Sequence, residues 1–198
     1  SVGSANGISE GIPNVVKIYT PPPGSPKAIA GERIMIVLNY DGRLWGQVYN
    51  GSAWGNVQNF VTLTPANHLP YLSFDGAYEW SSSSFVLVYS EGGTTDGTQL
   101  GYAKFDGSSW VTTTGSFPAE PGSAVYRWVR VAAQPKDGSN RIIAVVGDTS
   151  SELYAIWWST GATASWGSWT TLTDGVSLPN TMDSVENIME TICEAFEK

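Results

Sequence analysis

Apolar residues along this chain occur in short runs that are separated by glycine- and aspartate-rich turns. The run over 33–40 (RIMIVLNY) predicts a buried strand, and after a tight turn residues 44–49 predict the returning strand. Asn50-Gly51 predicts a second hairpin turn, of type I′, after which residues 55–64 alternate as a further strand. This part of the chain therefore predicts an antiparallel meander.

The same order of elements returns twice. Further strands are predicted over residues 71–78, 85–89, 100–105 and 110–114, and again over 126–133, 142–146, 153–158 and 166–172. A shorter β-prone run, 15–19, precedes the first unit and ends at a Pro-Pro-Pro-Gly segment that no strand can continue through. Units of ~55 residues with four short strands match a propeller blade in length and order.

A turn phrase marks each of the three units. The segment Tyr49-Asn50-Gly51-Ser52-Ala53-Trp54 is similar to Phe105-Asp106-Gly107-Ser108-Ser109-Trp110 and, more loosely, to the segment from Trp158 to Trp166. Trp54, Trp110 and Trp166 are spaced 56 residues apart. Because a fixed period marks one supersecondary unit used repeatedly, we predict an all-β fold of about three four-stranded antiparallel units. The three tryptophans are predicted to pack between neighbouring units.

Three segments are predicted along the chain. We assign residues 1–24 to a flexible N-terminal segment with one short strand, 25–180 to the β-repeat domain and 181–198 to a C-terminal segment. The repeat units are placed at roughly 25–65, 70–118 and 124–175. Apolar residues between 184 and 197 recur at helical spacing, after a capping-box pair, Asp183 and Glu186. Alignment of 195–197 with 77–79 instead predicts a donated strand, so helix and strand both stay open.

Closure of the repeat is a difficulty, because known propellers need at least about four blades. Either the chain is part of a larger protein, or several chains complete the structure together, or the strands form a sandwich or barrel. An unpaired sheet edge is an aggregation site. We therefore expect a partner or cap over that edge, through self-association or within a larger surface assembly.

Composition narrows the class of partner. The net charge is −8, and the 10 Lys and Arg residues are spread thinly, so nucleic acid and anionic membrane surfaces are not expected as partners. The sequence has no run of 18 apolar residues, so no membrane-spanning helix is predicted. Cys193 is the single cysteine, so no disulfide can form within one chain. Nine Trp and nine Tyr beside 14% charged residues favour an extracellular or cell-surface protein. The start at Ser1 fits either a removed signal peptide or a trimmed chain.

The turn phrases at 49–54 and 105–110 resemble those of secreted β-propeller repeats. Similar repeats occur in fucose-binding lectins, more distantly in the Asp-box repeats of sialidase-like proteins, and in bacterial and archaeal surface proteins. The resemblance covers about residues 33–175. It implies a propeller-like fold and, for the lectin type, sugar pockets between blades lined by Arg, Glu and Trp. This chain has no Arg/Glu pair that recurs at blade spacing.

Catalytic chemistry has little support in the sequence. The single histidine, His68, lies in a proline-flanked loop without a second ligand at metal spacing, and Cys193 lies on an apolar face, so no metal, cofactor or catalytic residue is predicted. Five carboxylates could converge as a glycosidase pair, namely Asp75, Glu79, Glu91, Asp148 and Glu152. A sialidase-like site would also need an arginine cluster, whereas Arg127, Arg130 and Arg141 all belong to one unit.

Aromatic residues provide better candidates for binding. Five tryptophans exceed the one per blade that packing needs, and they are candidates for a ligand or interface: Trp45, Trp80, Trp157, Trp158 and Trp169. Exposed Trp rings stack on sugar rings and anchor protein interfaces, although half-buried strand positions explain them as well. Asn50-Gly51-Ser52 fits an N-glycosylation acceptor, and equally fits turn chemistry.

These observations predict a non-catalytic, exported β-repeat protein that acts as a structural or adhesive subunit of an extracellular or cell-surface assembly. The alternative is a lectin-like carbohydrate-binding module that uses Trp and Tyr stacking. A sialidase-like glycoside hydrolase is the further alternative.

Overall fold

The computed structural model describes residues 12–62, 73–91, 99–114, 125–136, 139–148, 152–159 and 165–172, and these residues form three antiparallel sheets. The first sheet has the order β1 (Pro13–Tyr19), β2 (Glu32–Asn39), β3 (Arg43–Asn50) and β4 (Trp54–Thr62). The second has the order β5 (Phe74–Tyr78), β6 (Phe85–Ser90), β7 (Leu100–Phe105) and β8 (Trp110–Thr114). The third contains β9 (Tyr126–Ala133), β10 (Ile142–Asp148) and β11 (Leu153–Ser159), with β12 (Ser165–Trp166) and β13 (Thr170–Thr171) both paired to β11. The predicted all-β repeat is confirmed.

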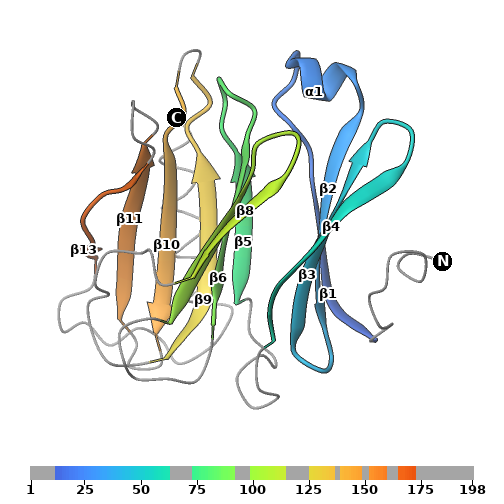
Figure 1. Cartoon of the computed structure of the whole chain (residues 1–198). Helices are drawn as coiled ribbons and strands as arrows, with labels where there is room; N and C mark the ends of the chain where they lie inside the picture. Colours follow the sequence, from blue (N-terminus) through green and yellow to red (C-terminus); the bar gives the residue numbers. More distant parts are fainter. Residues whose placement is uncertain are drawn as a thin grey trace.

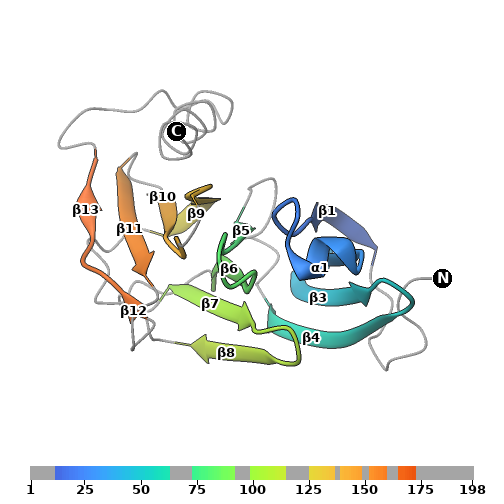
Figure 2. The same ribbon diagram turned by 90° about the horizontal axis from the view of Figure 1, so that it is seen from above.

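The three sheets stand side by side, and their first strands meet along one side of the molecule (Figures 1 and 2). Strand β5 lies against β9 and also contacts β1. The later strands of each sheet extend away from this inner side, as Figure 2 shows from above. Each sheet is thus a meander that runs from an inner to an outer strand.

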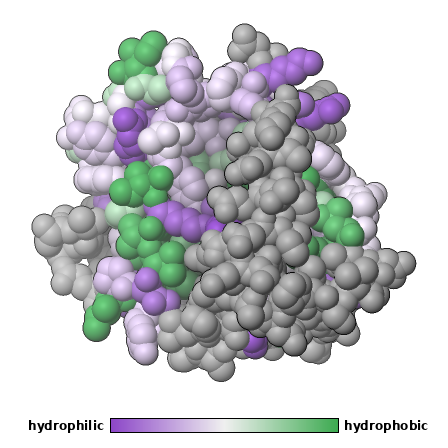
Figure 3. Space-filling view, turned by 180° about the vertical axis from the view of Figure 1, so that it is seen from behind, coloured by the Kyte–Doolittle hydropathy of each residue, from purple (hydrophilic) through white to green (hydrophobic). Residues whose placement is uncertain are grey.

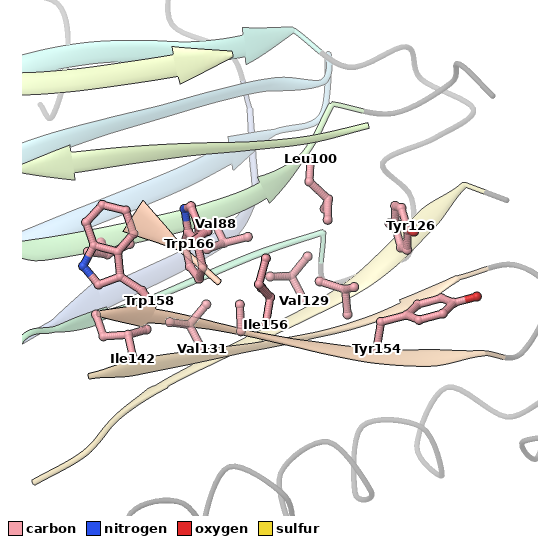
Figure 4. Close-up of a cluster of buried hydrophobic side chains, with 13 residues drawn as sticks. Val88, Leu100, Tyr126, Val129, Val131, Ile142, Tyr154, Ile156, Trp158 and Trp166 are labelled. Carbon is pink, nitrogen blue, oxygen red and sulfur yellow. The ribbon is translucent and has the colours of Figure 1, made fainter. Parts of the chain in front are cut away.

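Two apolar clusters fill the spaces between the sheets. The first joins residues of the first and second sheets, among them Ile34, Ile36, Phe85 and Leu87. The second joins the second and third sheets around Val88, Leu100, Ile156 and the two tryptophans Trp158 and Trp166 (Figure 4). Because side chains alternate across a strand, the second sheet contributes one face to each cluster, and β6 is buried on both sides.

The hairpin turn at Asn50-Gly51 differs from the predicted type. Gly51 and Ser52 are the two loop residues between Asn50 and Ala53, whose backbone N–H and C=O are hydrogen-bonded at 3.1 Å. Gly51 has a positive φ, of 95°, whereas Asn50 and Ser52 do not, so the turn is not of type I′, which needs a positive φ at both central residues. A Cβ at Gly51 would lie 1.9 Å from the carbonyl oxygen of Ala30, so a glycine is required here for space as well.

Three further features differ from the sequence-based expectation. The run at 15–19, which the sequence placed ahead of the first unit, belongs to β1, the inner strand of the first sheet. The single strand predicted over 166–172 is divided into β12 and β13, with Gly167 donating its backbone N–H to the Trp157 carbonyl between them. A short helix, α1 (Pro26–Ile29), was not predicted. Its N-cap is Ser25, whose hydroxyl accepts a hydrogen bond from the Ala28 N–H.

Some predictions fall outside the described residues. These are the helix or donated strand at 181–198 and the candidates His68 and Cys193. Within the part of the chain that the structure describes, no helix has both the length and the apolar character needed to cross a membrane.

Candidate functional site

A cleft of about 440 Å³ opens where the inner strands of the three sheets come together. It is formed by the ends of β1, β5 and β9 with the segments that follow them, so all three sheets contribute to its wall. Its lining comprises Ile18, Tyr19, Thr20, Pro21, Pro22, Pro23, Gly76, Ala77, Tyr78, Trp80, Val131, Ala132, Ala133 and Pro135. Among the described residues, this lining is aromatic and proline-rich and contains no Asp, Glu, Lys or Arg.

Three aromatic residues are among those that line the cleft. Trp80 is half-buried in the turn after β5. The hydroxyl of Tyr19 donates to Asp75 Oδ1 at 2.9 Å, and that of Tyr78 donates to Glu32 Oε1 at 3.1 Å. Burial, with the neighbouring carboxylate as a second cause, raises the pKa of both phenols above the ordinary tyrosine value. Both rings therefore stay neutral at physiological pH, and both are held in fixed orientations.

Asp75 connects the three inner strands beside this cleft. Its Oδ1 accepts hydrogen bonds from Lys17 Nζ at 3.0 Å and from the Tyr19 hydroxyl, both on β1. Its Oδ2 accepts from the backbone N–H of Val131 on β9, also at 3.0 Å. Since Tyr19 and Val131 line the cleft, the position of Asp75 sets the spacing of the cleft walls.

A second charged group lies between the second and third sheets. Glu79 is completely buried; its Oε1 accepts from the Trp158 indole N–H at 2.7 Å, and its Oε2 lies 3.2 Å from Lys104 Nζ. The Ser82 hydroxyl also donates to Glu79. The Lys104 ammonium lies 5.5 Å from the centre of the Trp158 ring, a cation–π distance. All these contacts are internal to the protein, so they indicate a structural role.

A similar arrangement joins the first and second sheets. Lys27 Nζ donates to the Ser83 carbonyl at 2.7 Å, lies 3.7 Å from Glu32 Oε1, and sits 5.5 Å from the centre of the Phe105 ring. Burial lowers the pKa of Lys27, while Glu32 opposes that shift. Each space between sheets therefore contains a lysine–glutamate pair with an aromatic ring beside the lysine.

The five candidate carboxylates do not converge on the cleft, and none of them lines it. Asp75 and Glu79 are bound by the structural partners above, and Asp148 accepts from the Glu152 N–H within its own hairpin. The candidates Arg127, Arg130 and Arg141 are also absent from the lining. Among the described residues, no group of three or more His, Cys, Asp and Glu could hold a metal ion.

The predicted binding aromatics are dispersed over the molecule. Trp80 alone lies in the cleft. Trp45 is buried with its indole N–H on Asn39 Oδ1 at 3.2 Å, and Trp158 is buried on Glu79. Trp157 is exposed on β11, and Trp169 is half-buried against the second apolar cluster. Trp45 and Trp158 therefore stabilise the protein from inside and present no ring to a ligand.

Trp54, Trp110 and Trp166, the tryptophans that end the three repeated turn segments, occupy equivalent positions in their sheets. Their surroundings differ. Each forms a cross-strand aromatic pair in its own sheet: Tyr49 with Trp54, Phe105 with Trp110, and Trp158 with Trp166. Trp110 also packs on Phe60 of the preceding sheet at 5.0 Å, and Trp166 packs on Tyr102 of the preceding sheet at 5.8 Å. Trp54 does not pack between sheets; it is 39% exposed, because the described residues place no sheet in front of the first one.

The Asn50 side chain closes its own turn. Its Oδ1 accepts from the N–H groups of Ser52 and Ala53 at 3.0 and 2.9 Å. Asp106 makes the same pair of bonds with Ser108 and Ser109 in the second sheet, at 2.8 and 3.0 Å. The shared geometry favours turn chemistry as the reason for Asn50, and glycosylation there stays a prediction.

Sequence reasoning missed Tyr19, Tyr78 and Asp75 as parts of one site. The 56-residue period contained a usable signal, because Asp75 is 56 residues from both Tyr19 and Val131, its partners on the neighbouring inner strands. The tryptophan turns, from which the period is predicted, do not by themselves point to these strand positions.

Comparisons with known proteins find solved structures that resemble this one, but no matching sequence. No family model and no curated protein sequence matches the chain. One similar structure is a point mutant of the Aleuria aurantia lectin in complex with Fucα1-6GlcNAc (TM-score 0.40, 16% identity, covering 74% of this chain and 45% of the lectin chain). Another is the fucose-specific lectin from Aleuria aurantia in a mercury-derivative form (TM-score 0.41, 18% identity, with the same coverage). This chain thus spans less than half the length of each lectin chain, and both are of the fucose-lectin type that its turn phrases resemble.

Proposed function

We propose that this protein is a non-catalytic carbohydrate-binding protein whose ligand lies in the cleft between the inner strands. The observation that carries the proposal is the lining of a cleft of about 440 Å³, in which the half-buried Trp80 is accompanied by Tyr19, by prolines and by apolar residues of all three inner strands. Small-molecule sites are typically concave, mostly apolar and of about 300–1,000 Å³. Aromatic rings offer a flat apolar face, which complements the apolar face of a pyranose ring.

The same lining indicates the charge of the ligand. The lining residues that the structure describes include no Asp, Glu, Lys or Arg that could pair with a charged group. Burying an ionised group without a partner is costly, and the chain as a whole carries a net charge of −8. A neutral glycan therefore fits this cleft better than a sialylated or uronic one. We propose an extracellular or cell-surface location on the basis of composition.

The test is binding of a panel of neutral and acidic glycans, which includes fucose and Fucα1-6GlcNAc, followed by tryptophan fluorescence and calorimetry. We expect Trp80→Ala to abolish binding of the best ligand, and Trp157→Ala to leave it unchanged, since Trp157 is exposed away from the cleft. An array without any binder would overturn the proposal. Loss of binding in Trp157→Ala with retention in Trp80→Ala would place the site elsewhere.

A second candidate function is that of a structural or adhesive subunit that assembles with other molecules. It is favoured by Trp54, which holds the position of the packed Trp110 and Trp166 and nevertheless remains exposed. Electron microscopy of the purified protein should then show rings, filaments or defined pairs of molecules. Single particles of one chain at high concentration would count against this candidate.

A further inference from the structure

The turn between β3 and β4 presents an exposed asparagine directly before a glycine. Asn50 is the last residue of β3, and its turn lies beside α1 at one end of the first sheet (Figure 1). Among the asparagines that the structure describes, Asn50 alone is followed by glycine. Glycine has no side chain to crowd its backbone nitrogen. The Gly51 nitrogen therefore has open access to the side-chain amide of the residue before it.

The three reacting groups of this pair are placed for an attack of the nitrogen on the amide. Asn50 Oδ1 accepts hydrogen bonds from the backbone N–H groups of Ser52 and Ala53, at 3.0 and 2.9 Å. Two donors on one oxygen stabilise the negative charge that develops there during attack on its carbon, as an oxyanion hole does. Within the described part of the chain, neither the Gly51 N–H nor Asn50 Nδ2 has a hydrogen-bond partner. The attacking nitrogen and the leaving amine are thus both unrestrained.

We propose that Asn50 is a site of spontaneous deamidation, with the Gly51 nitrogen as the nucleophile. This nitrogen gives up its proton to solvent and bonds to Asn50 Cγ, while the carbonyl electron pair moves onto Oδ1. The pair returns as the Cγ–Nδ2 bond breaks, and the amine takes a proton from solvent and leaves as ammonia. Water then opens the resulting five-membered imide at one of its two carbonyl carbons. Opening at Cγ gives aspartate, and opening at the main-chain carbon gives isoaspartate.

The fold accommodates the aspartate product. Asp106 makes the same pair of bonds to Ser108 and Ser109 in the second sheet, at 2.8 and 3.0 Å. An aspartate at position 50 can therefore keep every turn contact that Asn50 Oδ1 makes, and it adds one negative charge.

The isoaspartate product does not fit the same turn, because it inserts one more carbon into the main chain. Gly51 lies close to the end of α1: a Cβ built on Gly51 would be 1.9 Å from the Ala30 carbonyl oxygen. The Tyr49 hydroxyl also donates to the Gly51 carbonyl, at 3.0 Å. A lengthened main chain would shift Gly51 against these contacts, so isoaspartate should destabilise the turn.

The equivalent turn of the second sheet should resist the corresponding reaction. Asp106-Gly107 has the same geometry, but a nitrogen attacks a carboxyl group only in its neutral form. Backbone N–H groups of Ser109 and Ser108 lower the pKa of Asp106 to about 2, so this group is ionised at neutral pH. The amide of Asn50 is uncharged at every pH. Once Asn50 has become aspartate, its turn gains the same protection.

The modification would change the surface of the first sheet. From behind, hydrophilic and hydrophobic residues lie side by side on this side of the molecule, at the left of Figure 3. Asn50 is exposed, so the new carboxylate would remain in solvent and make the net charge of −8 more negative. Loss of the amide would also remove the atom that an N-linked glycan needs. This proposal is independent of glycan binding in the cleft.

The first test is peptide mapping by mass spectrometry after incubation of the folded protein at neutral pH. We expect the fragment that contains Asn50 to gain about 1 Da, the difference between an amide and an acid, while the Asp106 fragment forms no isoaspartate. The control is Asn50→Gln, whose longer side chain would have to form a six-membered ring and should stay unchanged. Asn6-Gly7, outside the described residues, falls in a separate fragment. An intact Asn50 after prolonged incubation, or isoaspartate at position 106 to the same extent, would overturn the proposal.

The second test separates the turn geometry from the dipeptide sequence. We expect Asn50 to convert in the folded protein at a rate within about tenfold of that in the urea-unfolded chain; greater slowing would show that the fold keeps the nitrogen away from Cγ and would overturn the proposal. The Asn50→Asp variant should unfold at the same urea concentration as the unmodified protein, and the purified isoaspartate form at a lower one. An Asn50→Asp variant as unstable as the isoaspartate form would contradict the accommodation of aspartate.

Discussion

The carboxylate of Asp75 in β5 accepts a hydrogen bond from the backbone N–H of Val131 in β9, with 3.0 Å between oxygen and nitrogen. The other oxygen of the same carboxylate binds Lys17 and Tyr19 in β1. One side chain thus fixes the inner strands of all three sheets, although the segments involved are 56 to 58 residues apart.

Replacing Asp75 should therefore affect both stability and the cleft. We expect Asp75→Ala to lower the free energy of unfolding by about 2–4 kcal/mol, because it removes the carboxylate that pairs with the part-buried Lys17 ammonium and accepts the Val131 N–H. The control is Asp41→Ala, whose exposed carboxylate binds only its neighbour Arg43 in the contacts seen here, and which should cost well under 1 kcal/mol. Urea unfolding measures both values, and equal losses would contradict the role of Asp75.

Trp110 and Trp54 should differ in their contribution to stability. Trp110 packs on Phe60, Phe85 and Phe105, so Trp110→Ala should cost about 3 kcal/mol or more. Trp54 packs only on Tyr49 among the aromatic rings seen and is partly exposed, so Trp54→Ala should cost about 1 kcal/mol at protein concentrations where the chain is monomeric. Thermal unfolding of dilute samples tests the difference. A Trp54→Ala cost as large as that of Trp110→Ala would mean that another segment covers this ring.

Glu79 should be one of the most sensitive polar positions. Its carboxylate is fully buried and receives Lys104, Trp158 and Ser82, so Glu79→Ala leaves a cation without its partner and an indole N–H without its acceptor. We expect a loss of about 3–5 kcal/mol. Lys104→Met in the same background should recover part of the loss, because it removes the unpaired charge. Chemical denaturation of the single and double variants measures the coupling, and additive losses would argue against a direct interaction.

The turn at Asp106 should make a small part of the free energy of unfolding depend on pH in the acid range. Backbone N–H groups of Ser109 and Ser108 lower the pKa of Asp106 to about 2, from an ordinary value of 3.8. Because the folded pKa lies below the unfolded one, the stabilisation is present above about pH 4 and is lost as the pH falls through about 2. Asp106→Asn should keep the turn, as Asn50 does in the first sheet, and should remove this dependence. The check is the difference between wild type and variant in unfolding free energy from pH 2 to 5; a difference that stays constant over this range would contradict it.

Local patterns in the sequence were sufficient to predict the repeat. Apolar runs that end at glycine turns predict strands such as 33–40 and 85–89, and this pattern depends only on neighbouring residues. The error in turn type has a local cause as well. A type I′ turn would place Asn50 at the centre of the turn, whereas Asn50 precedes the two loop residues and its side chain accepts their N–H groups, as that of Asp106 does in the next sheet.

The sequence by itself determined the all-β class, the 56-residue period and the equivalence of Trp54, Trp110 and Trp166. Only the tertiary structure decided which of these rings is packed, that Trp45 and Trp158 are buried, and that Trp80 shares a cleft with Tyr19 and Tyr78. The reason is physical. Turn chemistry and strand alternation act between residues that are close in the chain, whereas burial depends on which sheets lie side by side. Equivalent positions therefore differ where the described residues place no further sheet against the outer face of one sheet.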